Sequence, residues 1–113
     1  MSPIVDRLKA WSGLHRARTA TLGGHSLTVP PGVLDPVLFR SGSVLAEFVR
    51  DRVEVDQRVL DLGCGSGAVG VLCQGVGGRV CSTDVDPRAC AAARSNGISD
   101  VRMGSLFEPV RAL

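Results

Sequence analysis

Three features of this 113-residue chain combine residue types that could hold a ligand, and each follows a short apolar segment. They are a glycine-rich turn at 63–67 (GCGSG), Asp84 and Ser105. Glycines let a ligand approach the backbone because no Cβ stands in the way, and the helix after such a turn presents free N–H groups to an anionic part of the ligand. An acid such as Asp84 suits the paired hydroxyls of a ribose, which need an acceptor. Together these features indicate a site for a nucleoside-containing cofactor.

A parallel sheet would bring these three features together. We expect short helices between strands, with the strands at 59–62, 80–83 and 101–103 and the helices at 68–74 and 88–95. Asp86 and Pro87 give the second helix an N-cap and a first-turn proline, and Asn96 and Gly97 end it. This alternation is typical of the α/β class, in which ligands bind at the carboxyl ends of parallel strands. One pocket could therefore gather all three features.

The residues before this core predict a helix, a hairpin and a second helix. Ser2 and Pro3 can begin an amphipathic helix that ends near residues 16–18, and Gly23 and Gly24 can join strands at 19–22 and 25–29 in a tight turn. After several prolines, Ser43 can cap a helix whose apolar residues fall on one side: Val44, Leu45, Phe48, Val49 and Val53. We therefore divide the chain into an N-terminal segment, 1–54, and a cofactor-binding core, 55–113.

The composition excludes several classes of protein. A hydrophobic fraction of 44% with 21% charged residues indicates a globular chain, and the net charge of +2 is scattered, so it neither supports nor excludes a nucleic-acid substrate. The four cysteines show no zinc or redox spacing, and we read them as buried thiols of a reducing compartment. No signal peptide or membrane span is evident. We expect a soluble cytoplasmic protein without a metal site.

The glycine pattern fits two classes of cofactor, because residues 65–70 (GSGAVG) also satisfy the G-x-G-x-x-G fingerprint of dinucleotide-binding proteins. Asp61, two residues before Gly63, favours the other class. A dinucleotide would place its diphosphate near this carboxylate, where like charges repel. S-adenosylmethionine has no phosphate and carries an ammonium and a sulfonium, for which a nearby acid is favourable. One half of an NAD-dependent oxidoreductase remains the alternative.

The segment 59–71 (VLDLGCGSGAVGV) resembles motif I of class I S-adenosylmethionine-dependent methyltransferases, D/E-x-G-x-G-x-G. Residues 80–97 resemble the second motif of this family, and 103–109 (MGSLFEP) resemble its third-strand segment. Residues 29–48 are similar to the loop and helix that precede the core in the small-methyltransferase branch. The resemblance covers roughly residues 28–110. It implies a Rossmann-like parallel sheet, S-adenosylmethionine as cofactor and S-adenosylmethionine-dependent methyl transfer as function.

The same resemblance implies roles for particular residues. The methionine part of the cofactor would lie against Asp61, Gly63, Gly65 and Gly67, and Cys64 would offer backbone contacts. The ribose hydroxyls would bind Asp84, and the adenine would lie against Val85. Ser105 and Leu106 stand at the adenine-contacting position after the third strand, where the family often has Asp. For Asp86 we favour helix capping over ligand contact.

The resembled fold has seven strands, whereas this chain ends at Leu113 after the third. It would then be the N-terminal, truncated part of the fold, without the fourth-strand motif N/D-P-P-Y that grips the methyl acceptor. We therefore assign no catalytic residue and no acceptor. We expect the first strand to have an unpaired edge, which a partner chain could complete. A non-catalytic cofactor-binding module that acts with a partner is the other alternative.

Overall fold

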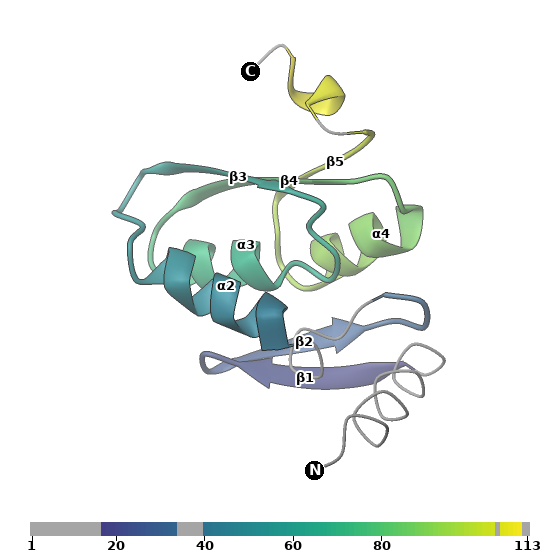
Figure 1. Ribbon diagram of the computed structural model, residues 1–113, viewed down its shortest axis with the longest axis horizontal. Coiled ribbons are helices and arrows are strands. Elements are labelled where there is room, and N and C mark those ends of the chain that lie inside the picture. The colour runs from purple at the N-terminus through teal and green to yellow at the C-terminus, as the bar shows by residue number, and fades with distance from the viewer. Residues whose placement is uncertain (1–16, 34–39, 106, 112–113) are drawn as a thin grey trace.

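The computed structural model describes residues 17–33, 40–105 and 107–111 (Figure 1). The helix expected over residues 2–16 lies outside this part, as does Leu106. Within it, no helix has the length and apolar character needed to cross a membrane.

The first described element is the expected hairpin. Strand β1 (Arg18–Leu22) pairs antiparallel with β2 (His25–Val29). Gly23 and Gly24 form the turn with φ angles of 56° and 81°, which a two-residue turn that matches the strand twist requires at both positions. Alternate residues of both strands are buried, as the burial pattern shows for Ala20, Leu22, Leu27 and Val29. The hairpin therefore has one face against the rest of the molecule.

Helix α2 (Arg40–Arg50) begins before Ser43, so Ser43 lies inside the helix and does not cap it. The expected apolar face was also wrong. Ala46 is buried and Val49 is partly buried, whereas Val44, Leu45 and Phe48 are exposed. The small side chain of Ala46 lets α2 pack closely on α3, and this contact decides which face of the helix is buried.

The second half of the described chain forms the expected parallel sheet. Its strands are β3 (Arg58–Leu62), β4 (Arg79–Asp84) and β5 (Asp100–Met103), in the order β3-β4-β5. Both pairs of neighbouring strands are parallel. The predicted α/β fold class and the predicted order of the three core strands are thereby confirmed.

Two helices connect the strands, and a short 3-10 helix follows them. Helix α3 (Ala68–Gly75) joins β3 to β4, and α4 (Pro87–Ser95) joins β4 to β5. The 3-10 helix η1 (Glu108–Val110) follows β5 and was not expected from the sequence. Because each of these helices directly follows a strand, the N-termini of α3 and α4 lie at the carboxyl end of the sheet.

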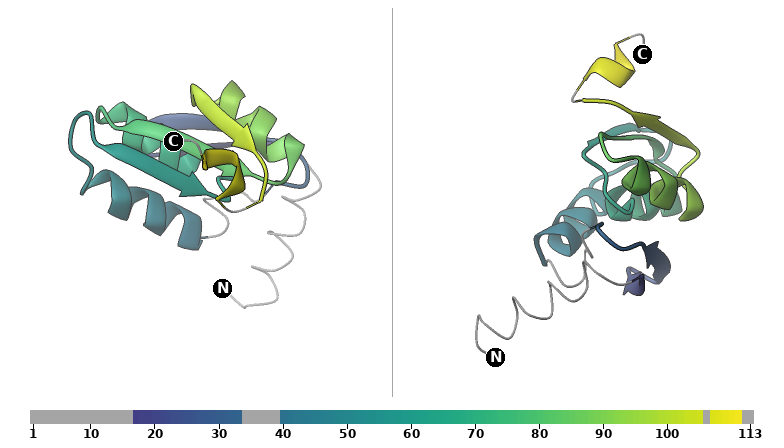
Figure 2. Two further views of the ribbon diagram at one scale, coloured as in Figure 1. Left: turned by 90° about the horizontal axis from the view of Figure 1, so that it is seen from above. Right: turned by 90° about the vertical axis from the view of Figure 1, so that its right-hand side faces the viewer.

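The described elements form layers (Figures 1 and 2). Helices α2, α3 and α4 lie on one side of the sheet, and the hairpin lies beyond the helices. Buried residues from the hairpin, such as Leu27, join the same hydrophobic cluster as Leu72 of α3 and Val80 of β4. The hairpin thus contributes buried side chains to the same hydrophobic core as the helices and the sheet.

In the described part of the chain no α-helix lies on the other side of the sheet, and only the short helix η1 lies there, next to β5. Leu60 pairs in register with Cys81 and points to this side, where its side chain is 42% exposed. Strand β3 is also an edge strand of the described sheet. An apolar side chain on an exposed edge is a feature that proteins normally cover.

Candidate functional site

The glycine-rich turn at 63–67 connects β3 to α3, and its three glycines adopt the left-handed region. The φ angles are 72° for Gly63, 56° for Gly65 and 96° for Gly67. A Cβ on Gly63 or Gly65 would meet no atom within 4 Å, whereas one on Gly67 would lie 3.3 Å from Ala93 of α4. Gly63 and Gly65 therefore leave space open at the carboxyl end of the strands, and Gly67 allows close packing against α4.

Backbone hydrogen bonds fold this turn over the end of β4. The N–H of Cys64 donates to the carbonyl of Thr83 (2.8 Å), and the N–H of Gly67 donates to the carbonyl of Cys64 (3.0 Å). Most of the turn's peptide groups are thus oriented by bonds within the protein. These bonds hold the turn in one shape.

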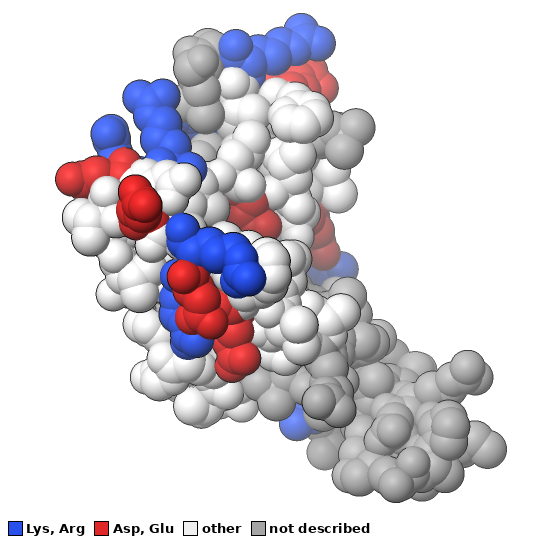
Figure 3. Space-filling model, turned by 60° about the vertical axis from the view of Figure 1, so that its left-hand side comes forward, with Lys and Arg blue, Asp and Glu red and all other residues white. Residues whose placement is uncertain are grey.

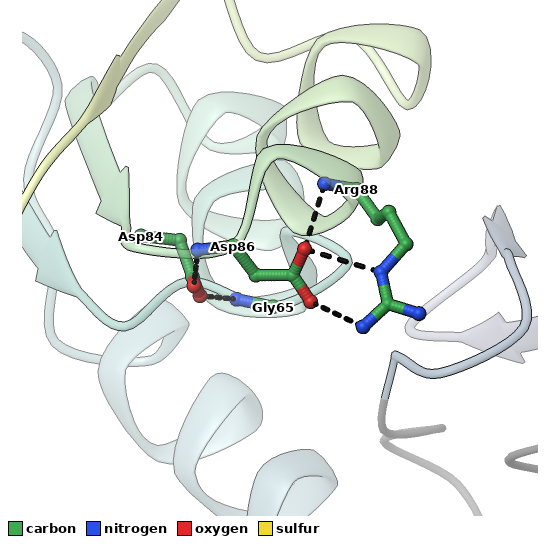
Figure 4. A network of polar contacts seen from close by, with 4 residues as sticks. All are labelled: Gly65, Asp84, Asp86 and Arg88. Atoms are coloured by element: carbon green, nitrogen blue, oxygen red, sulfur yellow. Dashed lines mark hydrogen bonds and ion pairs between the residues drawn. The ribbon is translucent and has the colours of Figure 1, made fainter.

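Asp84 connects the ends of two strands (Figure 4). One oxygen of its carboxylate accepts from the N–H of Gly65 (3.0 Å) and the other from the N–H of Asp86 (2.9 Å). The backbone carbonyl of Asp84 also accepts from the N–H of Gly104, beyond β5 (3.0 Å). A carboxylate oxygen can accept more than one hydrogen bond, so both oxygens keep capacity for a ligand hydroxyl.

Asp86 serves as the N-cap of α4, as expected. Its side chain accepts from the N–H of Arg88 (2.9 Å) and pairs with the Arg88 guanidinium at 3.1 Å (Figure 4). The hydrogen bonds from Arg88 lower the pKa of Asp86. Pro87 occupies the first turn of the helix, where its missing N–H costs nothing.

Asp61 lies near the carboxyl end of β3, close enough to Asp84 for their charges to interact. Burial and, to a smaller extent, the negative charge of Asp84 together raise the pKa of Asp61 from 3.8 to about 6. Within the described residues its Oδ2 atom is buried and has no hydrogen-bond partner. The same is true of the hydroxyl of Ser82, which pairs with Asp61 in register. A buried acceptor without a partner is costly and is suited to a donor that a ligand supplies.

Cys64 lies in the turn and its thiol is buried. Burial, with smaller contributions from Asp61 and Asp84, raises the pKa of this thiol to about 12. A thiol with this pKa stays neutral at physiological pH and cannot serve as a nucleophile. Cys64 therefore contributes packing and its backbone groups.

Two further predicted residues, Val85 and Ser105, lie at the same edge of the sheet. Val85 follows β4 and is 65% exposed, and Ser105 follows β5 and is also exposed. Sequence reasoning treated Asn96 only as the end of α4, yet its side chain donates to the carbonyl of Ser66 in the glycine-rich turn (2.8 Å). An Asn-Gly pair signals a helix end, and no local signal identifies such a long-range contact.

Two surface features lie away from this site. On the face that Figure 3 shows, acidic and basic residues are interspersed and form no continuous basic surface. A depression of about 920 Å³ lies at the amino ends of the strands, with Arg58, Arg79 and Asp100 in its lining. It lies opposite the glycine-rich turn, because the strands are parallel and the turn follows the carboxyl end of β3.

A parallel sheet with a preformed glycine-rich turn after its first strand and an acid after its second defines a Rossmann-like α/β protein with a nucleoside site. Solved structures support this fold. The chain is 20% identical to a tRNA (uracil-54, C5)-methyltransferase of Pyrococcus abyssi in complex with S-adenosyl-L-homocysteine, with a TM-score of 0.61 over 80% of this chain and 24% of the other. It is 16% identical to Methanocaldococcus jannaschii Trm5 in complex with adenosine, with a TM-score of 0.63 over 88% of this chain and 32% of the other. The fold is that of a class I methyltransferase.

The sequence comparisons identify the family. Residues 36–107 match the methyltransferase small domain, and the chain belongs to this family. It is 44% identical over 70 residues to a ribosomal protein L11 methyltransferase of Burkholderia mallei and 41% identical to that of Paraburkholderia phymatum. Each match covers 56% of this chain and 23% of the relative, so the chain corresponds to less than a quarter of these proteins.

Proposed function

We propose that this chain forms the S-adenosylmethionine-binding part of a methyltransferase, with the cofactor at the carboxyl edge of β3, β4 and β5. The observation that carries the proposal is the buried Oδ2 of Asp61, which has no hydrogen-bond partner among the described residues and lies beside a turn that is open at Gly63 and Gly65. An ammonium group fits this atom because it brings both a donor and a positive charge. Membership of the methyltransferase small domain family supports the same cofactor.

We assign each predicted residue a part in this site. The ammonium end of the cofactor would lie at Asp61 and along the glycine-rich turn, whose backbone contacts include Cys64 and Gly67. The ribose hydroxyls would donate to the free lone pairs of Asp84, which is already oriented by two backbone N–H groups. The adenine would lie between Val85 and the segment of Ser105 and Leu106.

When bound, S-adenosylmethionine supplies a methyl group on a sulfonium, which a nucleophile of the acceptor can take directly. The residues of this chain contribute binding and orientation, because a preformed turn and a fixed carboxylate hold the reacting group in one place. We assign no general acid, base or nucleophile within the chain, and the neutral thiol of Cys64 agrees with this.

The dinucleotide alternative is less compatible with the site. Gly70, the last glycine of the G-x-G-x-x-G pattern, packs so tightly that a Cβ would lie 2.5 Å from Ile98, which is also the role of that glycine in dinucleotide folds. The pattern therefore does not discriminate by itself. Asp61 and Asp84 place two carboxylates near the turn, and a diphosphate there would be repelled.

We extend the proposal to acceptor, location and assembly. Ribosomal protein L11 is the first acceptor to test, because the relatives matched at 41–44% identity are named for it. All four cysteines are free thiols, which supports a reducing compartment such as the cytoplasm. The unpaired edge of β3 and the exposed Leu60 support a further strand at this edge, from a longer protein or from a partner chain.

Calorimetric titration of the chain with S-adenosylhomocysteine tests the proposal, with NADH as the parallel ligand. We expect S-adenosylhomocysteine to bind and NADH to give no signal. Binding of NADH alone would favour the oxidoreductase alternative. Absence of binding by either ligand to folded protein would refute the cofactor assignment for this chain.

A further inference from the structure

The side chain of Asn96, at the end of α4, contacts two segments that lie far from it in the sequence. Its Oδ1 accepts from the N–H of Thr28 (2.7 Å), and its Nδ2 donates to the carbonyls of Thr28 (2.9 Å) and Ser66 (2.8 Å). Thr28 belongs to β2, and Ser66 lies in the glycine-rich turn. A single side chain thus joins the hairpin, α4 and the turn.

The contact with Thr28 has the form of a strand pairing. The amide of Asn96 presents a carbonyl and an N–H side by side, and these meet the N–H and the carbonyl of one residue of β2. This match also determines the orientation of the amide. In the flipped orientation the NH2 group of Asn96 would face the N–H of Thr28, and its oxygen would face the carbonyl of Thr28. Asn96 is therefore held in place before it contacts the turn.

The contact with Ser66 completes the restraint of one peptide group. The carbonyl of Ser66 accepts from Asn96, and the N–H of the same peptide, which belongs to Gly67, donates to Cys64 (3.0 Å). Both ends of the peptide are bound, so its plane cannot rotate without losing two hydrogen bonds. Ser66 is 3% exposed, so without Asn96 its carbonyl would lose this hydrogen bond in a largely buried place.

We propose that Asn96 is a positioning residue: it holds the peptide between Ser66 and Gly67, and so the glycine-rich turn, in the orientation that the cofactor requires, and it couples the turn to the hairpin. The cofactor part of this inference rests on the function proposed above, whereas the coupling of turn and hairpin does not. Only an amide offers one acceptor and two donors on a short planar group. Aspartate at this position keeps the shape and loses both donors.

The test compares Asn96→Asp with Ser95→Asp, which places the same charge on the neighbouring, exposed residue of α4. Affinity for S-adenosylhomocysteine is measured by calorimetry, and exchange of the Gly67 amide hydrogen is measured by NMR without ligand. We expect Asn96→Asp to weaken binding roughly tenfold and to accelerate exchange at Gly67, because the hydrogen bonds to two carbonyls are lost. We expect Ser95→Asp to change neither.

Each outcome decides a part of the proposal. Equal exchange at Gly67 in the two variants would overturn the coupling, and faster exchange with unchanged affinity would overturn the positioning role. If the unmodified chain does not bind S-adenosylhomocysteine, the proposed function fails while the exchange measurement still tests the coupling. If Asn96→Asp does not fold, hydrogen exchange in the unmodified chain tests the coupling instead. We then expect the amides of Thr28 and Gly67 to be protected alike. A freely exchanging Gly67 amide beside a protected Thr28 amide would overturn the coupling.

Discussion

The carboxylate of Asp84 accepts a hydrogen bond of 3.0 Å from the N–H of Gly65, which links the end of β4 to the turn that follows β3. Its other oxygen binds the N–H of Asp86. The acid proposed to hold the ribose is therefore also a structural residue of the glycine-rich turn. The bond to Gly65 thus fixes both the position of this carboxylate and the shape of the turn.

Replacement of Asp84 by alanine should reduce both cofactor binding and stability. Two backbone N–H groups lose a charged acceptor, and hydrogen bonds to charged groups contribute about 1.5–3 kcal/mol each. We expect affinity for S-adenosylhomocysteine to fall by more than about tenfold and the free energy of unfolding to fall by about 3 kcal/mol or more. Calorimetry and urea denaturation measure the two effects.

Asp86→Ala is the matched control for this prediction, since it removes the neighbouring acid. Loss of the N-cap and of the pair with Arg88 should lower the free energy of unfolding. Because neither contact reaches the glycine-rich turn, affinity should stay within about twofold of the unmodified chain. Equal loss of affinity in the two variants would contradict the role given to Asp84.

Alanine at Gly63 and at Gly67 should have different consequences. Both glycines have positive φ angles, 72° and 96°, but a Cβ at Gly63 enters open space whereas one at Gly67 lies 3.3 Å from Ala93. Both variants should lose roughly 1 kcal/mol from backbone strain, and Gly67→Ala should lose more from packing. Gly63→Ala should reduce affinity more, because its Cβ occupies the space proposed for the cofactor. Urea denaturation measures stability and calorimetry measures affinity. If Gly63→Ala were the less stable variant and Gly67→Ala the weaker binder, the placement of the site would be contradicted.

Stability should decrease as pH rises from about 4 to about 6, because burial and Asp84 raise the pKa of Asp61 from 3.8 to about 6. In this window the folded chain keeps a proton that the unfolded chain releases, so the acid favours folding below the window and disfavours it above. The contribution of this one group is at most roughly 3 kcal/mol. Asp61→Asn should be more stable than the unmodified chain near pH 7 and should lack this slope in urea denaturation, and an unchanged slope would contradict the assignment.

Binding of S-adenosylhomocysteine should strengthen over the same pH range. Its ammonium favours the ionised form of Asp61, so the ligand must displace a proton below about pH 6. Calorimetry in buffers of different ionisation enthalpy should detect proton release at about pH 5.5 and almost none at about pH 8. In Asp61→Asn the release should disappear and the affinity should fall by about tenfold.

The four cysteines should resist alkylation in the folded chain. All are buried, and burial raises the pKa of each thiol, that of Cys64 to about 12. Reaction requires the thiolate and access to it, so iodoacetamide at about pH 8 should label the urea-unfolded chain and leave the native one unlabelled. Mass spectrometry after a timed reaction measures this. Rapid labelling of Cys64 in the native chain would show that the turn opens readily.

The sequence was sufficient to predict the core because its signals are local. Short apolar runs, the glycines at 63–67 and the cap formed by Asp86 and Pro87 each act within a few residues, and the structure places strand and helix ends within one residue of the prediction. The parallel sheet follows from their alternation. The position of Asp84 beside the turn follows from the sheet, although its two backbone hydrogen bonds do not.

Features that depend on distant contacts were missed. The apolar residues of α2 lie on more than one side, and only packing against α3 selects Ala46 and Val49 for burial over Leu45. The contact of Asn96 with Thr28 spans 68 residues. Neither the buried face of α2 nor the contact of Asn96 has a local sequence pattern, because the surface that each contacts is formed by elements distant in the sequence.

The amide of Asn96 also bears on how this fold can be recombined. The family match begins at residue 36, whereas Thr28, which supplies two of the three hydrogen bonds to the Asn96 side chain, precedes it. A chimera that joins residues 36–107 to a foreign N-terminal segment would keep the glycine-rich turn and Asp84 but would lose the strand that holds Asn96. The crossover point that preserves the proposed cofactor site therefore lies before the hairpin, even though the hairpin contributes none of the residues assigned to the cofactor.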